Sequence, residues 1–101
     1  MTLTISHNQE TKELRIRTPV KFDFSVHQDF RKAIDWNQKE IKTIVIDLQA
    51  TDYLDSAALG MLLILRDKMN DDKNSVHLIH AKPEVIKILK IANFDQLFSL
   101  K

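Results

Sequence analysis

Polar and apolar residues alternate at the start of the chain, which is the spacing of a half-buried strand. Leu3 and Ile5 alternate with threonines, and the alternation resumes over 14–17 after a polar turn. This pattern predicts a β-hairpin. Three further strands are predicted: a central β-branched run at 42–48, a short segment at 76–80 and a closing edge strand at 98–100.

Helical spacing of the apolar residues predicts three helices and a short final turn. They cover residues 26–38, 56–70, 83–92 and 93–97. The first follows a Ser25-x-x-Gln28 spacing typical of a capping box, and the third has Pro83 in its first turn. Strands that alternate with helices after a hairpin predict an α/β domain. We expect a mixed sheet of four to five strands, preceded by the hairpin and packed with three to four α-helices.

The predicted helix at 56–70 has more apolar residues than one buried face needs. At 100° per residue, one face collects the residues expected against the sheet, namely Ala58, Met61, Leu62, Leu65 and Met69. Leu59 and Leu63 form a second stripe, which either packs against the third helix or is an exposed patch for a partner. Gly60 between them either lets a partner backbone approach closely or packs against a neighbouring loop.

Composition limits the classes of protein to which this chain can belong. Its 101 residues form one domain, 1–101, and 15 basic against 14 acidic residues give a net charge of +1. Without a Lys/Arg stripe we expect no nucleic-acid binding, and without cysteine there are no disulfides. The longest apolar run, 57–65, is far below the ~20 residues of a membrane span, and the N-terminus lacks signal-peptide features. We therefore expect a soluble, cytoplasmic domain that does not contact membranes.

The strongest candidate for chemistry is the dipeptide Asp55-Ser56, which stands where a helix is predicted to begin. Asp55 suits the N-cap, accepting a hydrogen bond from the N–H of Ala57 or Ala58, and Ser56 is then the first helical residue with its hydroxyl pointing outward. A helix start offers unpaired N–H groups and a partial positive charge, so it accepts an anion such as a phosphate at little cost. The other interpretation is that Asp55-Ser56 only caps a helix.

The segments around this dipeptide resemble a known family. Asp47-Leu48 closing a strand, Leu54-Asp55-Ser56 and then Gly60 in an apolar helix are similar to the signature of STAS domains, and within them to the anti-sigma factor antagonists of bacterial partner-switching systems. The resemblance runs through essentially the whole chain. It implies a small α/β fold in which a serine kinase phosphorylates Ser56 and a PP2C-type phosphatase removes the phosphate. Many members carry Ser-Gly after the phosphoacceptor, whereas Ala57-Ala58 follow here, which leaves a single phosphoacceptor.

The same resemblance implies roles for the neighbours of Ser56. Asp23 stands where the family has an acidic residue near the phosphoacceptor, for kinase recognition or support of the loop; from the residues alone it could equally be an extra cap or a solvated charge. Asp55 would support the phosphosite. We expect the partner-binding surface to comprise Asp52, Tyr53, Ala57, Leu59, Gly60 and Leu63.

Other chemistry is not indicated. The histidines have no partners at metal-ligand spacing, and His77 and His80 would point to opposite faces of a predicted strand. No Gly-x-Ser-x-Gly elbow surrounds Ser56. We expect no metal, no cofactor and no enzymatic activity.

The sequence therefore predicts a monomeric regulatory binding module. With Ser56 unmodified it would bind a serine kinase or anti-sigma-like protein, or a downstream effector. Two alternatives remain. STAS domains also serve as constitutive subunits of transporter assemblies, and some bind nucleotides or other small ligands, although this chain has no Gly-rich loop for phosphates.

Overall fold

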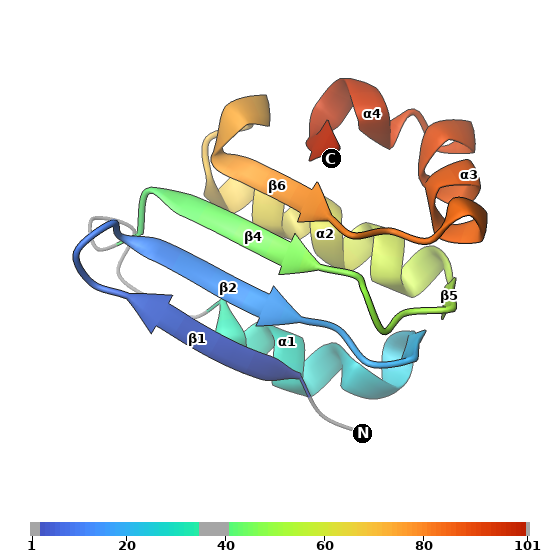
Figure 1. Ribbon diagram of the computed structural model, residues 1–101, viewed down its shortest axis with the longest axis horizontal. Coiled ribbons are helices and arrows are strands. Elements are labelled where there is room, and N and C mark those ends of the chain that lie inside the picture. Colours follow the sequence, from blue (N-terminus) through green and yellow to red (C-terminus); the bar gives the residue numbers. More distant parts are fainter. Residues whose placement is uncertain (1–2, 35–40, 101) are drawn as a thin grey trace.

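A five-stranded mixed sheet forms the centre of the fold, in the order β1-β2-β4-β6-β7. This is seen in a computed structural model, which describes residues 3–34 and 41–100 (Figure 1). Its strands are β1 (Thr4–Asn8), β2 (Glu13–Arg17), β4 (Thr43–Asp47), β6 (Val76–Ile79) and β7 (Ser99–Leu100). β1 and β2 pair antiparallel, and every other pair is parallel. The predicted mixed α/β architecture is confirmed, with the hairpin as part of the sheet.

Helices cover one face of this sheet and the edge beyond β6. In Figure 1, α1 and α2 lie behind the strands, and α3 and α4 lie beyond β6. The helices are α1 (His27–Ala33), α2 (Ser56–Lys68), α3 (Pro83–Ile91) and α4 (Phe94–Leu97), with 3-10 turns η1 (Phe24–Val26) and η3 (Lys73–Ser75). Among the residues that the structure describes, no helix has the length and apolar character needed to cross a membrane.

The core lies between the sheet and the helices because the strands alternate. Side chains from β2, β4 and β6 are buried on one face, namely Leu14, Ile16, Ile44, Ile46, Val76 and Leu78. The expected face of α2 is buried with them, which confirms its predicted orientation: Ala58, Met61, Leu62, Leu65 and Met69. The opposite face of the sheet carries more polar residues, such as Glu13 and Arg15.

The predicted start of the first helix is wrong in detail. Asp23, rather than Ser25, is the capping residue, and it caps the 3-10 turn η1 by accepting a hydrogen bond from the Ser25 N–H. Helix α1 then begins at His27 with Val26 as an N-cap that makes no side-chain hydrogen bond. A carboxylate two residues before Ser25 offers a strong local acceptor, so an Asx turn forms instead of the capping box. The predicted helix end at 37–38 lies outside the described residues.

A second, two-stranded sheet connects the segments that precede α1 and α2. β3 (Lys21–Phe22) pairs in parallel with β5 (Tyr53–Leu54). Outside the ladder, the Asp52 N–H donates to the Val20 carbonyl at 2.9 Å. The sequence analysis did not predict this pair because two residues are too few to show a periodicity.

Buried threonines fasten the loops that lead into these short strands. The Thr51 hydroxyl donates to the Pro19 carbonyl at 2.7 Å and lies 2.5 Å from the Thr18 hydroxyl. The Thr18 N–H donates to the Asp47 carbonyl at 3.1 Å. Because Thr18 and Thr51 are both buried, these polar groups depend on one another for hydrogen bonds.

Replacing Thr51 with valine should therefore destabilise the domain. Thr51→Val keeps the shape but leaves the buried Pro19 carbonyl without its donor, so we expect the free energy of unfolding to fall by about 1–3 kcal/mol. Urea denaturation followed by circular dichroism measures it. The control Thr11→Val, in an exposed turn, should change stability by less than ~0.5 kcal/mol. Equal unfolding midpoints for the two variants would contradict the assignment.

Candidate functional site

Ser56 is exposed and begins helix α2. Asp55 is the N-cap, in an extended conformation, and its Oδ1 accepts a hydrogen bond from the Ala58 N–H at 2.9 Å. The predicted cap is confirmed. The Ser56 hydroxyl makes no side-chain hydrogen bond with the residues that the structure describes. The first-turn N–H groups and this free hydroxyl therefore form an accessible place for a phosphate.

Asp23 stands beside this helix start because of the β3–β5 pairing. Phe22 is paired with Leu54, so Asp23 and Asp55 are each the next residue along two adjacent strands. The Asp55 N–H donates to the Phe22 carbonyl at 3.3 Å, which continues the connection. The two capping residues thus follow directly after adjacent two-residue strands.

Asp23 is held ionised by its own turn. Its Oδ1 accepts hydrogen bonds from the Ser25 hydroxyl and from the Ser25 N–H. These bonds, the hydroxyl first, hold the pKa of the Asp23 carboxyl below its ordinary value, and the nearby charge of Lys21 acts in the same direction. At neutral pH the ionised carboxylate therefore caps η1 and adds negative charge near Ser56.

The residues expected at a partner surface differ in exposure. Asp52 and Tyr53 are exposed, whereas Ala57, Leu59 and Gly60 are partly buried. Leu63 is 42% exposed, so it forms an open apolar position on α2. Leu59 packs partly against the core. Leu59 therefore fits the interpretation that the stripe packs inside the protein, whereas Leu63 fits the interpretation that it is an exposed patch.

Gly60 is not required by packing within the described part of the chain. A Cβ added to Gly60 would meet nothing within 4 Å. The interpretation that this glycine packs closely against a neighbouring loop is therefore wrong. Approach by a partner backbone stays a prediction.

Three exposed apolar residues, which we call the apolar rim, lie in or beside β3 and β5; Tyr53 was expected at the partner surface, whereas Val20 and Phe24 were not. Phe24 is 65% exposed and Tyr53 50% exposed. The Phe24 ring stacks on His27, with ring centroids 5.0 Å apart and planes at 18°. No periodicity marks Val20 and Phe24 as exposed, because the neighbouring strand β3 has only two residues.

One ion pair and one side-chain hydrogen bond join segments that are distant in the sequence. Lys82, the residue before α3, pairs with Asp52 in the loop before β5. Arg66 of α2 donates from Nε to the Leu97 carbonyl of α4 at 2.9 Å. The sequence analysis did not identify either contact, because the partners are about thirty residues apart.

A second cluster surrounds the buried Asp47 at the end of β4. Its Oδ1 lies 3.1 Å from Nδ1 of His80 and accepts from the Gln49 N–H at 3.0 Å, and its Oδ2 lies 3.8 Å from Nε of Arg17. The expectation that His80 belongs to a strand is wrong. β6 ends at Ile79, and His80 has a φ of 59°, which allows its ring to reach Asp47. Within 3–34 and 41–100 no group of three or more potential ligands could hold a metal ion.

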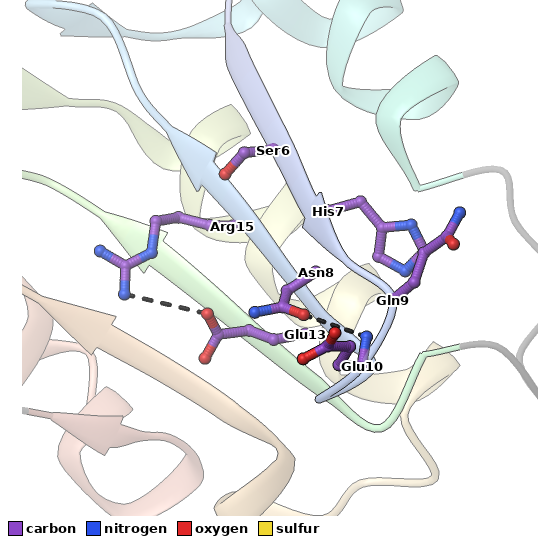
Figure 2. A pocket seen from close by; sticks show the side chains of 7 residues that line it. All are labelled: Ser6, His7, Asn8, Gln9, Glu10, Glu13 and Arg15. Atoms are coloured by element: carbon purple, nitrogen blue, oxygen red, sulfur yellow. Dashed lines mark hydrogen bonds and ion pairs between the residues drawn. The ribbon is translucent and has the colours of Figure 1, made fainter.

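A polar hollow lies at the opposite end of the sheet, around the β1–β2 turn (Figure 2). There Arg15 and Glu13 form an ion pair at 3.9 Å, and the Asn8 side chain accepts from the Glu10 N–H at 3.0 Å. His7 points away from this pair in Figure 2. Because β2 and β4 run parallel, this turn and the β4 end that leads to Ser56 are at opposite ends of the strands.

Comparison with known proteins identifies the family. The family model of the STAS domain matches residues 3–101. A STAS-domain containing protein of Pseudomonas aeruginosa (strain UCBPP-PA14) is 43% identical over 100 residues, covering 99% of each chain. The chain therefore belongs to the STAS-domain family.

Solved structures of anti-sigma factor antagonists share the fold. The unphosphorylated form of the antagonist SpoIIAA matches with a TM-score of 0.73 and 16% identity, over 98% of this chain and 86% of that chain. The phosphorylated form of the Bacillus protein SpoIIAA matches with a TM-score of 0.69 and 14% identity, over 98% and 90%. A STAS protein from Planctomyces limnophilus matches with a TM-score of 0.79 and 15% identity, over 99% and 89%.

Substitutions of Asp55 and Ser56 should affect stability differently, because Asp55 caps the helix and the Ser56 hydroxyl is free. Asp55→Ala removes the acceptor for the Ala58 N–H, so the free energy of unfolding should fall by about 1 kcal/mol, and Asp55→Asn should restore most of it. Ser56→Ala should change stability by less than ~0.5 kcal/mol. Urea denaturation measures all three. A loss for Ser56→Ala as large as that for Asp55→Ala would mean that the hydroxyl is structural.

Proposed function

We propose that this STAS domain is a phosphorylation-regulated protein-binding module, similar to an anti-sigma factor antagonist, in a bacterial partner-switching pathway. With Ser56 unmodified it binds a serine kinase or anti-sigma-like protein, or a downstream effector. Phosphorylation of Ser56 blocks that binding, and a PP2C-type phosphatase restores it. The observation that carries the proposal is the exposed Ser56 at the N-terminus of α2, together with the apolar rim of Val20, Phe24 and Tyr53.

The domain can carry a phosphate on Ser56 without refolding. The phosphate adds about −1.5 to −2 charges at neutral pH. The helix start favours that charge by about 0.3–1 kcal/mol at an exposed position. The carboxylates of Asp23 and Asp55 oppose it by amounts of the same order, reduced by salt. Because the two effects nearly cancel, the phosphate changes the surface and leaves the fold alone.

A bound partner is affected much more than the fold. A protein that covers Ser56 would have to remove water from a dianion, which costs several kcal/mol unless a cation pairs with it. A penalty of only ~2.7 kcal/mol lowers affinity about 100-fold. The mechanism is therefore direct blockade of an interface.

The apolar rim supplies the binding energy that the phosphate would remove. Large exposed aromatic side chains are typical of docking surfaces. Phe24 from η1 and Tyr53 from β5 belong to this rim, and Leu63 from α2 is a further exposed apolar residue. The three come from different elements, so a partner can contact all of them only in this fold. Asp23 and Asp55 add acidic groups beside the phosphoacceptor that a kinase can recognise.

The solved forms of SpoIIAA support the proposal through the fold. That antagonist has structures in an unphosphorylated and a phosphorylated form, and both have TM-scores near 0.7 against this chain. The same architecture thus accommodates a phosphate in SpoIIAA. The module itself performs no catalysis here, because the kinase brings the nucleotide and metal and the phosphatase brings its own site.

Phosphorylation can be tested on the whole chain. Incubation with ATP, Mg²⁺ and fractionated lysate of the source bacterium should add one phosphate, and fragment mass spectrometry should place it on Ser56. Ser56→Ala should remain unmodified. The matched control Ser6→Ala, at another exposed serine, should be modified like the wild type. Failure of every fraction to add phosphate would favour the alternative of a constitutive subunit in a transporter assembly.

Blockade can be measured with a phosphate mimic. The protein retained on an immobilised Ser56→Ala bait is purified, and its affinity is measured by calorimetry. Ser56→Asp should weaken this complex, by less than the ~100-fold or more expected of the full phosphate because a single carboxylate carries less charge, whereas Ser56→Ala should bind like the unmodified wild type. The control Ser6→Asp adds the same charge elsewhere and should bind normally. Equal affinities for the two Ser56 variants would refute blockade.

The apolar rim should contain the strongest contributors to binding. Phe24→Ala and Tyr53→Ala should each weaken the same complex about 10-fold, because both remove large exposed side chains next to Ser56. Stability should change little. Ile91→Ala, at a residue of α3 that is 75% exposed, is the control and should bind normally. If only Ile91→Ala weakens binding, the docking surface lies on α3.

A further inference from the structure

The two edges of the main sheet are built very differently. At one edge β7 has only two residues. At the other, β1 has five residues, all exposed, and no strand among the described residues pairs with its outer side. Proteins usually protect such an edge with Lys, Pro, a bulge or a covering segment. β1 reads Thr-Ile-Ser-His-Asn, without proline or a formal charge.

The buried face of the sheet continues to this unprotected edge. The register pairs Ile5 with Ile16 and His7 with Leu14, so Ile5 lies on the face that the helices cover. Ile16 is fully buried, yet Ile5 is 46% exposed. The apolar row thus reaches the edge and has no neighbour there.

A cleft between β1 and α1 borders the same position. It has a volume of about 290 Å³ and is lined by Leu3, Ile5, Asp29, Lys32 and Ala33. A strand added to the outer side of β1 would cover Ile5 from one side, and its own side chains would enter this cleft. The backbone groups and the apolar contacts therefore favour the same occupant, an additional β-strand.

The charges on α1 indicate which strand fits. Asp29 and Lys32 are one turn apart and line the same cleft, and neither forms an ion pair within the described residues. Figure 1 shows α1 running along the sheet on the β1 side. When two copies meet edge to edge about a two-fold axis, their α1 helices are antiparallel. If the axis passes between these two positions, Asp29 of one copy would face Lys32 of the other, and the reverse pair would form as well. The surface is complementary to itself.

We propose that β1 pairs antiparallel with β1 of a second copy of this chain, so that two sheets join into one continuous sheet. The monomer expected from the sequence is then one half of a dimer. Because each copy contributes a five-residue strand and a few side chains, the dimer is weak and forms with increasing concentration. The apolar rim lies on other elements, so this association does not depend on the proposed regulation at Ser56.

Sedimentation of the full-length chain over a concentration series tests the proposal. The wild type should shift from monomer to dimer. Ile5→Lys places a charge in the seam and should raise the dimer dissociation constant at least ~10-fold. Ile91→Lys makes the same change at an exposed site on α3 and should dimerise normally. Circular dichroism checks that each variant is folded.

A charge exchange gives a second test that does not alter the apolar contact. Lys32→Asp opposes carboxylates across the axis and should weaken the dimer, whereas adding Asp29→Lys to it should restore affinity to within ~3-fold of the wild type. Damage to α1 alone would not be rescued in this way.

Three outcomes would overturn the proposal: a wild type that stays monomeric at its highest soluble concentration, a dimer that survives both Ile5→Lys and Lys32→Asp, and failure of the double exchange to restore the dimer. The first would leave the β1 edge to an extended segment of another protein. Ser56→Asp should dimerise like the wild type, so a failure of the proposed regulation gives a different result from a failure of this interface.

Discussion

The pairing of β3 with β5 is the constraint on which the candidate site depends. These two-residue strands would not be stable alone, since a short isolated pair has too few contacts. They persist because buried Thr18 and Thr51 fasten the loops before them, and because Phe22 and Leu54 are part of the main core. The pairing then places the starts of η1 and α2 side by side, with Asp23 and Asp55 as their caps.

Much of the fold could be predicted from the sequence, because long periodic segments carry their own signal. The β-branched run at β4 and the apolar face of α2 show it most clearly, and both lie where the periodicity placed them. The Asp55 cap was also predictable, since a carboxylate before an apolar helical run has a local physical reason to be there. These features depend on neighbours close in sequence.

The remainder depends on local competition between capping groups and on contacts between distant residues. The Ser25-x-x-Gln28 spacing fits a capping box, yet Asp23 competes more effectively for the Ser25 N–H and the turn becomes 3-10. His80 lies just after the end of β6, and its Nδ1 is 3.1 Å from Oδ1 of the buried Asp47, thirty-three residues away in the sequence. The exposure of Phe24 could not be predicted, because the β3–β5 pair that precedes it is too short to leave a pattern in the sequence.

The fold separates two surfaces that could act together. The Ser56 surface is built from β5, α2 and η1 at the carboxyl ends of the parallel strands, whereas the unpaired edge belongs to β1. A dimer through β1 would present two Ser56 sites at a fixed spacing. A partner with two binding sites would then bind more tightly than one site allows, because its second contact is intramolecular. Phosphorylation of one copy would remove that advantage while leaving a weaker single contact, so the response would be graded.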